Sequence, residues 1–255
     1  EMTAIEPHQF AARVRGRRAL VTGAGGSIGS ELSRQLAAAG AEVILLDHSE
    51  TAIYVIAQEL SSRFPDRRFS SVIADLRDRN RLANVMRRER PEMVFHAAAC
   101  KHVPLMEENP IEAVTTNIFG TRHLVELSEE VGVKNLVLIS TDKAVRPTSI
   151  MGATKRIAEL LLFSKPRRPA LSVVRFGNVF GSSGSVVPLF RRQIEAGGPV
   201  TVTHPHVVRF FMTIPEAVFL VIQSALLTRK KDLFVLEMGQ PIRIFDLARD
   251  MITLF

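Results

Sequence analysis

Cysteine is almost absent from this chain, which has a single one, Cys100, among its 255 residues. One cysteine excludes an internal disulfide and fits a reducing cytoplasm. Long apolar runs are missing as well, since the stretch Ala217–Ile222 is far shorter than the roughly 18 residues that cross a bilayer. The first 18 residues are polar and then basic, unlike a signal peptide. We therefore expect a cytoplasmic location.

Aromatic side chains are also scarce, with no tryptophan and one tyrosine. The net charge is +7, but the basic residues are not interleaved with aromatic ones, so we expect no nucleic-acid partner. Solvated faces and helix ends are the simplest explanation of the excess charge. An anionic membrane surface and a polyanionic substrate are the sharper alternatives. The lone histidines and Cys100 are not spaced as metal ligands, and no metal site is predicted.

Apolar, strand-like segments alternate with amphipathic stretches of helix length as far as residue 176. The predicted strands are 18–22, 42–46, 69–73, 93–95, 136–139 and 171–175. The predicted helices are 27–39, 50–63, 78–89, 110–131 and 149–164. This alternation is typical of βαβ units on a parallel sheet that is covered on both faces. The sequence therefore predicts an α/β fold with a doubly wound parallel sheet of the Rossmann type.

The composition changes after residue 176, where glycine and proline become frequent. Short strands at 200–203 and 233–236 are predicted on either side of a helix at 215–228. We interpret this part as a smaller lobe on the carboxyl edge of the sheet. The predicted organisation is a basic lead-in over 1–17, an NAD-binding domain over 18–176 and a substrate-binding lobe over 177–255. This lobe looks truncated, because the chain stops inside a helix that begins near residue 244.

The stretch VTGAGGSIGS follows the first predicted strand and carries Gly23, Gly26 and Gly29. Gly23 permits a tight turn, Gly26 lets the backbone approach a pyrophosphate, and Gly29 lets the next helix pack close to its strand. The helix start at Ser27 and Ile28 then offers N–H groups and a positive dipole end to phosphates. The strand before and the helix after this loop favour a dinucleotide site over a simple glycine turn.

Acidic residues end the second and third predicted strands. Asp47 lies close to the expected ~20 residues beyond Gly23 for a carboxylate that binds a ribose. No lysine or arginine occurs at 46–50 to accept a 2′-phosphate, which favours NAD over NADP. Asp75, followed by Leu76, ends the third strand, where an adenine amino group could bind. Each of the two carboxylates could instead cap the following helix.

Six longer motifs occur in an order that resembles one enzyme family. They are GAGGSIGSEL, HAAACKHVPLMEENP, TNIFGT, ISTDKAVRPTSIMGATKR, VRFGNVFGSSGSVVPLF and RFFMTIPEA. From about Arg18 to its end, the chain resembles an extended short-chain dehydrogenase/reductase of the polysaccharide-biosynthesis (CapD-like) branch. More narrowly, it resembles the nucleotide-sugar 4,6-dehydratases whose best-known activity is on UDP-N-acetylglucosamine. The resemblance implies an NAD cofactor, a UDP-sugar substrate and a role in bacterial surface glycan biosynthesis.

Large members of that branch carry an N-terminal membrane region before the catalytic domain. We expect the chain to be either a short member or an excised cytoplasmic domain of an inner-membrane protein, and its truncated end favours excision. Helices such as 110–131 and 149–164 commonly build dimers in this fold, so we also expect a homo-oligomer.

The resemblance also implies roles for single residues. Ala97, Ala98 and Ala99 would let the nicotinamide ribose lie against the sheet edge, Asn117 would lie on the cofactor side, and Lys155 would hydrogen-bond the nicotinamide ribose. The residues implied near the sugar and the nucleotide diphosphate are Lys101, His102, Asn178, Ser185, Val186 and Arg209.

One position departs from the pattern of short-chain dehydrogenases. Their active-site tyrosine lies one helical turn before the lysine, and here that position is Met151, which cannot transfer a proton. The only tyrosine, Tyr54, lies on the helix after the second strand, where we expect it to pack. It cannot reach a reacting carbon from there. The proton transfers must therefore involve other groups, or the protein is not an enzyme.

The motif STDKA offers such groups at the end of the fifth predicted strand, and related dehydratases use this position. Thr141 would relay the proton of the sugar 4-hydroxyl, Asp142 would act as the acid for the 6-hydroxyl, and Lys143 would act as the base at C5. Lys155 would make the local field positive. The alternative is an exposed ion pair of residues 142 and 143 beside a turn, with a methionine that fills the core.

Three functions follow, in decreasing order of support from the sequence. The first is 4,6-dehydration of UDP-N-acetylglucosamine with retention at C5, which is the outcome that accompanies the methionine variant in the family. The second is a nucleotide-sugar 4-epimerase, which would not need the acid and base at 142 and 143. The third is a non-catalytic NAD-binding sensor.

Overall fold

The computed structural model describes residues 7–164, 169–182 and 184–254. Within these ranges, seven parallel strands form the central sheet in the order β10-β6-β5-β4-β1-β2-β3. The strands are β1 Arg18–Thr22, β2 Glu42–Asp47, β3 Phe69–Ile73, β4 Met93–His96, β5 Asn135–Thr141, β6 Ala170–Phe176 and β10 Lys231–Val235. The order reverses between β1 and β4, where doubly wound sheets bind their ligands. The predicted Rossmann-type fold is confirmed.

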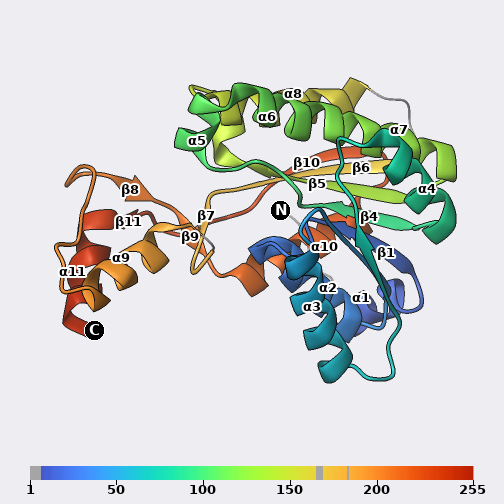
Figure 1. Cartoon of the computed structure of the whole chain (residues 1–255), viewed down its shortest axis with the longest axis horizontal. Coiled ribbons are helices and arrows are strands. Elements are labelled where there is room, and N and C mark those ends of the chain that lie inside the picture. Colours follow the sequence, from blue (N-terminus) through green and yellow to red (C-terminus); the bar gives the residue numbers. More distant parts are fainter. Residues whose placement is uncertain (1–6, 165–168, 183, 255) are drawn as a thin grey trace.

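Helices cover both faces of this sheet (Figure 1). One layer consists of α1 Pro7–Val14, α2 Ser27–Ala38, α3 Glu50–Arg63 and α10 Ile214–Leu227. The other consists of α4 Arg79–Glu89, α5 Val103–Glu108, α6 Pro110–Ala113, α7 Thr121–Val131 and α8 Ile150–Ser164. Alternate strand residues supply the two cores, since Val21 packs under the first layer and Leu20 under the second. The lead-in predicted over 1–17 contains α1, whose Phe10 ring lies 5.6 Å from that of Phe219 on α10.

The predicted helix over 110–131 is interrupted in the structure. Between α6 and α7 the chain forms a π-helical segment, η1 Val114–Gly120. Such segments are rare and often lie at functional sites. Here the segment carries the buried Asn117.

A smaller group of elements lies beyond the carboxyl end of β6, at the left of Figure 1. It contains β7 Asn178–Val179, α9 Val186–Glu195, β8 Val208–Arg209, β9 Phe211–Met212, β11 Ile242–Arg243 and α11 Ile244–Leu254. Strand β7 pairs with β9, and β8 pairs with β11. Phe190, Ile244 and Met251 form part of a separate small core.

Two elements predicted for the smaller lobe lie with the central sheet instead. β10 pairs in parallel with β6, and α10 packs against α2, β5 and β6. This packing buries the apolar face of α10, including Val218, Val221 and Ile222. The division of the chain at residue 176 otherwise remains a prediction.

The strand predicted over 200–203 is wrong. The segment is irregular, and the Gln193 side chain on α9 takes the place of a neighbouring strand. Gln193 accepts a hydrogen bond from Thr201 N at 3.1 Å and donates one to Thr201 Oγ1 at 2.8 Å. Among the described helices, none combines the length and the apolar character that a bilayer crossing requires.

Candidate active site

A cavity of about 780 Å³ opens at the carboxyl edge of the central sheet. Its walls come from the segments that follow β1 to β6, which brings together residues far apart in the sequence. The predicted residues that line it are Gly23, Gly26, Ser27, Ile28, Gly29, Asp47, Asp75, Leu76, Ala97, Ala98, Ala99, Lys101, His102, Thr141, Lys143, Met151, Lys155, Asn178 and Ser185. Asn117, Asp142, Val186 and Arg209 are not part of this lining.

The glycine loop leaves a cradle with no room for side chains. Gly23 has φ +69°, and a Cβ there would lie 2.7 Å from Ala98 N. A Cβ at Gly29 would overlap the Gly23 carbonyl oxygen. Gly26 precedes α2 and provides no side-chain cap, and the N-terminal end of the α2 dipole faces the cavity. This arrangement fits a pyrophosphate.

Asp47 is buried at the end of β2 with its carboxylate directed at the glycine loop. It accepts hydrogen bonds from Gly25 N and from Ser49 N, both at 3.1 Å. The cap of α3 is the Ser49 hydroxyl, which accepts from Ala52 N at 3.3 Å, so Asp47 is not needed as a cap. Gly25 is not among the predicted site residues, although a Cβ there would overlap that of Ala52. The signal was present as the adjacent pair of glycines at 25 and 26.

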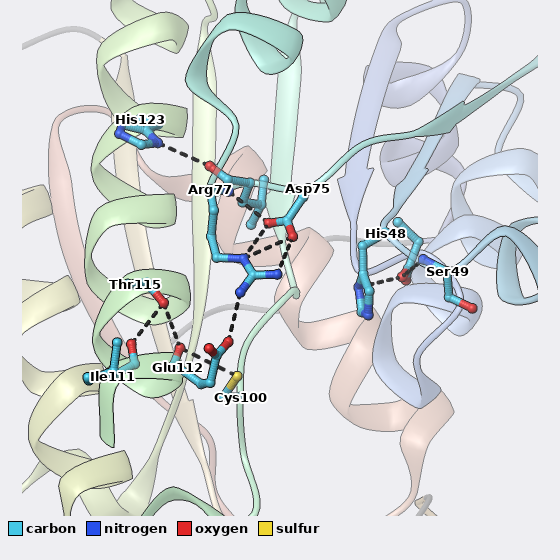
Figure 2. Close-up of polar contacts among 11 residues, drawn as sticks. His48, Ser49, Asp75, Arg77, Cys100, Ile111, Glu112, Thr115 and His123 are labelled. Carbon is cyan, nitrogen blue, oxygen red and sulfur yellow. Dashed lines mark hydrogen bonds and ion pairs between the residues drawn. The ribbon is translucent and has the colours of Figure 1, made fainter. Parts of the chain in front are cut away.

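Arg77 connects two carboxylates across the nucleotide end of the cavity (Figure 2). Its Nη2 donates to Asp75 Oδ2 at 2.6 Å, and its Nη1 donates to Glu112 Oε2 at 2.7 Å. Hydrogen bonding from Arg77 holds the pKa of Asp75 below its ordinary value. The side chain that caps α4 is Asp78, so the capping alternative for Asp75 is not observed. Arg77 is not among the predicted site residues, because no spacing in the sequence links it to Glu112.

A buried histidine lies beneath the loop of small residues that follows β4. His96 Nδ1 is 2.8 Å from Thr22 Oγ1, and its Nε2 is 2.9 Å from Thr121 Oγ1. Thr121 donates its own proton to Asn117 O at 2.6 Å, so it accepts from His96 Nε2–H, and Thr22 donates to Nδ1. Burial, together with the charge of Lys155, lowers the pKa of His96 to about 3. His96 is therefore neutral, and across the described ranges no group of three or more potential metal ligands is found.

Asn117 acts as a clamp beside the cavity. Its Oδ1 accepts from Cys100 N at 2.8 Å, and its Nδ2 donates to Cys100 O and to Thr154 Oγ1, both at 3.0 Å. These bonds fix the loop after β4 against α8. The structure therefore gives Asn117 a positioning role and does not place it in the cavity wall.

The three predicted proton-transfer groups are connected to one another at the end of β5. Thr141 Oγ1 donates to Asp142 Oδ1 at 2.8 Å, and Lys143 Nζ donates to the same oxygen at 3.0 Å. Thr141 and Lys143 line the cavity, whereas the Asp142 side chain is 47% exposed. The exposed ion pair considered as an alternative is thus present. The same contacts join a hydroxyl, a carboxylate and an amine.

Met151 and Lys155 lie one turn apart on α8, and both are buried. Burial lowers the pKa of Lys155 from 10.5 to about 8, although the charge of Glu159 opposes this shift. A Cβ at Gly152 would lie 2.5 Å from Lys143 O, so glycine lets α8 approach the turn that carries the acid and the base. Tyr54 is 61% exposed on α3, and its predicted packing role is wrong.

A buried carboxylate that the sequence analysis missed lies behind this site. Glu159 accepts hydrogen bonds from Ser140 Oγ, from Arg175 Nε at 2.8 Å and from Arg156 Nη1 at 3.0 Å. Burial raises the pKa of Glu159, but the hydrogen bonds from these three side chains outweigh burial and hold the pKa below its ordinary value. The cluster ties β5, β6 and α8 together next to Thr141 and Lys155.

The lobe contributes the remaining wall of the cavity. The ring of His102 packs against Gly184, where a Cβ would overlap it. Ser185 precedes α9, and its buried Oγ has no hydrogen-bond partner among the described residues. A buried hydroxyl of this kind suits a polar group of a ligand. Val186 begins α9, whereas Arg209 is exposed on β8 and donates to Val208 O at 2.9 Å.

Comparisons with known proteins agree with this architecture. A family model described as "Polysaccharide biosynthesis protein" matches residues 19–255. The chain is 51% identical over 254 residues to the probable polysaccharide biosynthesis protein EpsC of Bacillus subtilis. It is 53% identical over 240 residues to the capsular polysaccharide biosynthesis protein CapD of Staphylococcus aureus. These matches cover 98% and 92% of this chain but 42% and 40% of the relatives, so the chain spans less than half of their length.

Two further similarities concern proteins with named reactions. A UDP-N-acetylglucosamine 4,6-dehydratase (inverting) of Campylobacter jejuni is 34% identical over 221 residues, which are 82% of this chain and 63% of that protein. Among solved structures, the UDP-glucose 4-epimerase of Thermus thermophilus, in complex with NAD, superposes with a TM-score of 0.78 at 25% identity. That alignment covers 91% of this chain and 81% of the epimerase.

Proposed function

The chain belongs to the polysaccharide biosynthesis protein family, and from this membership we propose that it is an NAD-dependent nucleotide-sugar 4,6-dehydratase. The proposed substrate is UDP-N-acetylglucosamine, and the product is the 4-keto-6-deoxy sugar with retention at C5, made for surface glycans. The supporting observation is the connected group Thr141–Asp142–Lys143 at one end of a cavity shaped for a dinucleotide. The family contains sugar dehydratases and epimerases, and this group favours dehydration.

NAD fits the residues at the other end of the cavity. The glycine cradle and the N-terminal end of α2 suit its pyrophosphate, and Asp47 suits a ribose. Both arms of Arg77 are held by carboxylates, so this cation is not available for a 2′-phosphate. When bound, NAD supplies the removal of hydride from C4 of the sugar and its return at C6.

Thr141 and Asp142 provide a route for the proton of the 4-hydroxyl. The Thr141 hydroxyl donates to Asp142, so its lone pairs remain to accept from the sugar. The proton that leaves O4 can therefore pass through Thr141 to the Asp142 carboxylate. Asp142 is then a neutral acid, which is the form needed to protonate the departing 6-hydroxyl as water.

Lys143 completes the exchange as the base at C5. The scheme starts with Lys143 as the neutral amine, because its side chain is 37% exposed and its ammonium proton can pass to bulk water beforehand. The amine takes the proton from C5 and can return it to the same face after water has left, which gives retention. Over one turnover the proton from O4 leaves with the water, and both residues regain their starting states.

Two further residues, Lys155 and Met151, assist these steps without exchanging protons with the sugar. With a pKa of about 8, Lys155 is mostly cationic at neutral pH, and its charge favours loss of the proton from O4. Met151 is buried beside it and excludes water. In this scheme the missing tyrosine is replaced by Thr141.

Mass spectrometry of the product tests the proposal. The NAD-loaded chain is incubated with UDP-N-acetylglucosamine and no added reductant, and loss of one water is expected. An isomer of unchanged mass would instead identify an epimerase, and an unchanged substrate with NAD bound would identify a sensor. Reaction in deuterium oxide followed by NMR of the product reports the configuration at C5. Inversion there would contradict the role given to Lys143.

We further propose that the chain is the cytoplasmic domain of a longer protein that is anchored at the inner membrane, as the resemblance to the branch implies. Exposed apolar side chains on η1 and α8, among them Phe119, Ile157 and Leu160, support a homo-oligomer through these helices. Sedimentation of the purified chain measures its oligomeric state, and a monomer at all concentrations would contradict that proposal.

A further inference from the structure

The edge of the central sheet opposite the cavity is a continuous surface. All strands of this sheet are parallel, so their first residues lie side by side there. Backbone hydrogen bonds join the segments in a row, from Val43 N to Arg68 O, from Glu42 N to Arg17 O and from Glu92 N to Arg18 O. The row continues from Lys134 N to Glu92 O, from Ala170 N to Lys134 O and from Leu171 N to Lys230 O. Seven strands at the usual spacing make an edge about 29 Å long.

This amino edge is strongly basic. It is defined here by six exposed residues in the segments before β1, β3, β4 and β10, or at their first position: Arg15, Arg18, Arg67, Arg68, Arg90 and Lys230. Across the described ranges, none of the six forms an ion pair. The exposed carboxylates Asp66 and Asp232 share these segments but are outnumbered. A concentration of charge of one sign attracts partners of the opposite sign.

The side chains of two of the arginines both lie beside Gly40. A Cβ at Gly40 would lie 3.3 Å from Arg15 Cγ and 3.3 Å from Arg67 Nη1. Backbone hydrogen bonds hold both segments here, since Gly16 N donates to Gly40 O at 2.8 Å and Arg67 N donates to Phe64 O at 3.0 Å. Like charges held together by the fold are stabilised by an external anion.

We propose that the amino edge is a docking surface for anionic lipid headgroups. The basic residues are spread along an extended edge, and the described cavity lies at the opposite edge, so the arrangement suits a layer of phosphates better than a single bound anion. Phe64 and Phe69 are the aromatic residues of these segments, and both are partly buried rather than presented for stacking on bases, which disfavours nucleic acid. Each basic side chain near an anionic leaflet adds to the attraction.

Docking in this orientation leaves the candidate active site accessible. The lobe with α9 and α11 lies beyond the carboxyl ends of the strands (Figure 1). A nucleotide sugar could therefore enter from the side facing away from the lipid. The inference does not depend on the proposed reaction, since it uses no residue of the cavity.

Sedimentation with vesicles tests the proposal on the intact chain. One set of vesicles contains equimolar phosphatidylcholine and phosphatidylglycerol, and the other contains phosphatidylcholine alone. We expect binding to the first set only, with loss of binding at high salt. In the triple variant R15Q/R67Q/R68Q the partition coefficient should fall about a hundredfold, because each basic group contributes about a fivefold factor.

A matched variant separates the amino edge from net charge. R191Q/R192Q/R249Q removes the same charge from exposed positions on α9 and α11 and should bind vesicles like the unaltered chain. Thermal unfolding and NAD content should be the same in both triple variants. An equal loss of binding in both, equal binding to neutral vesicles, or preferential binding to duplex DNA at matched salt would each overturn the proposal.

Discussion

The two edges of the central sheet hold charge in opposite ways. At the carboxyl edge cations are matched to carboxylates, as Arg77 is to Asp75 and Glu112, and Lys143 is to Asp142. At the amino edge Lys134 pairs with Glu92, but the arginines, such as Arg68, are exposed and form no ion pair within the described ranges. A site that recognises one shaped ligand needs each charge fixed by a neighbour. A surface that meets a diffuse layer of opposite charge needs only a sufficient number of charges, and their exact positions matter less.

The largest expected effect comes from the acid and the base at the carboxyl edge. Asp142→Asn and Lys143→Ala should each lower the turnover of UDP-N-acetylglucosamine by about a hundred- to ten-thousand-fold. NAD should remain bound, as measured by its content in the purified variants. The amino-edge triple variant R15Q/R67Q/R68Q is the control and should keep its turnover. Near-normal turnover in either carboxyl-edge variant would remove that residue from the scheme.

The buried cluster behind the carboxyl edge sharpens the comparison for stability. Glu159→Gln leaves the buried guanidinium of Arg175 without its carboxylate and should cost about 3–5 kcal/mol of unfolding free energy in urea. The control is Glu195→Gln, which breaks the exposed pair with Arg191 and should cost about 1 kcal/mol or less. Equal losses would show that the cluster is not a structural hub.

Lys155 should make stability depend on pH. The ordinary pKa of 10.5 applies in the unfolded chain and a pKa of about 8 in the folded one, so the unfolded state binds more protons between these values. Burying the charged amine therefore costs stability below pH 8, and this cost disappears as the pH rises to 10.5. The effect amounts to about 3 kcal/mol. Lys155→Met should be more stable than the parent chain below pH 8 and lose that advantage above it, and a pH-independent difference would contradict the shift.

The smallest expected effect concerns the bridge at the nucleotide end. Arg77→Ala frees Asp75 and should weaken NAD binding about fivefold, since an exposed pair contributes about 1 kcal/mol. The control is Arg79→Ala, which removes the same charge from a pair with Glu130 on α4 and α7. Titration calorimetry with NAD compares the two. Equal weakening would mean that only net charge matters at this edge.

Much of the sheet could be predicted from local sequence patterns. Such patterns do not reveal contacts between residues that are far apart in the sequence. The strands through β6 are short apolar runs between helices, and the glycine loop directly follows the first of them, so both could be predicted. The place of β10 and α10 with the central sheet could not be predicted, because a short apolar run does not indicate which sheet it joins. The π-helical segment around Asn117 depends on contacts with Cys100 and Thr154, which lie far from it in the sequence.

The candidate site shows the same limit. Thr141, Asp142 and Lys143 are neighbours in the sequence, and their contacts follow from one turn. Glu112 reaches Arg77 across 35 residues, and no spacing rule signals that pair. The same holds for Arg175 and Glu159, which meet because β6 and α8 pack together.

Because Gly152 has no side chain, it sets how closely the amines of Lys143 and Lys155 approach each other. One added carbon there would meet Lys143 O and force α8 outward, and Lys155 would move with the helix while Lys143 stayed with the turn after β5. The two amines would then contact different atoms of a molecule bound between them. A change of chemistry on this scaffold could thus begin with a single methyl group that touches no substrate.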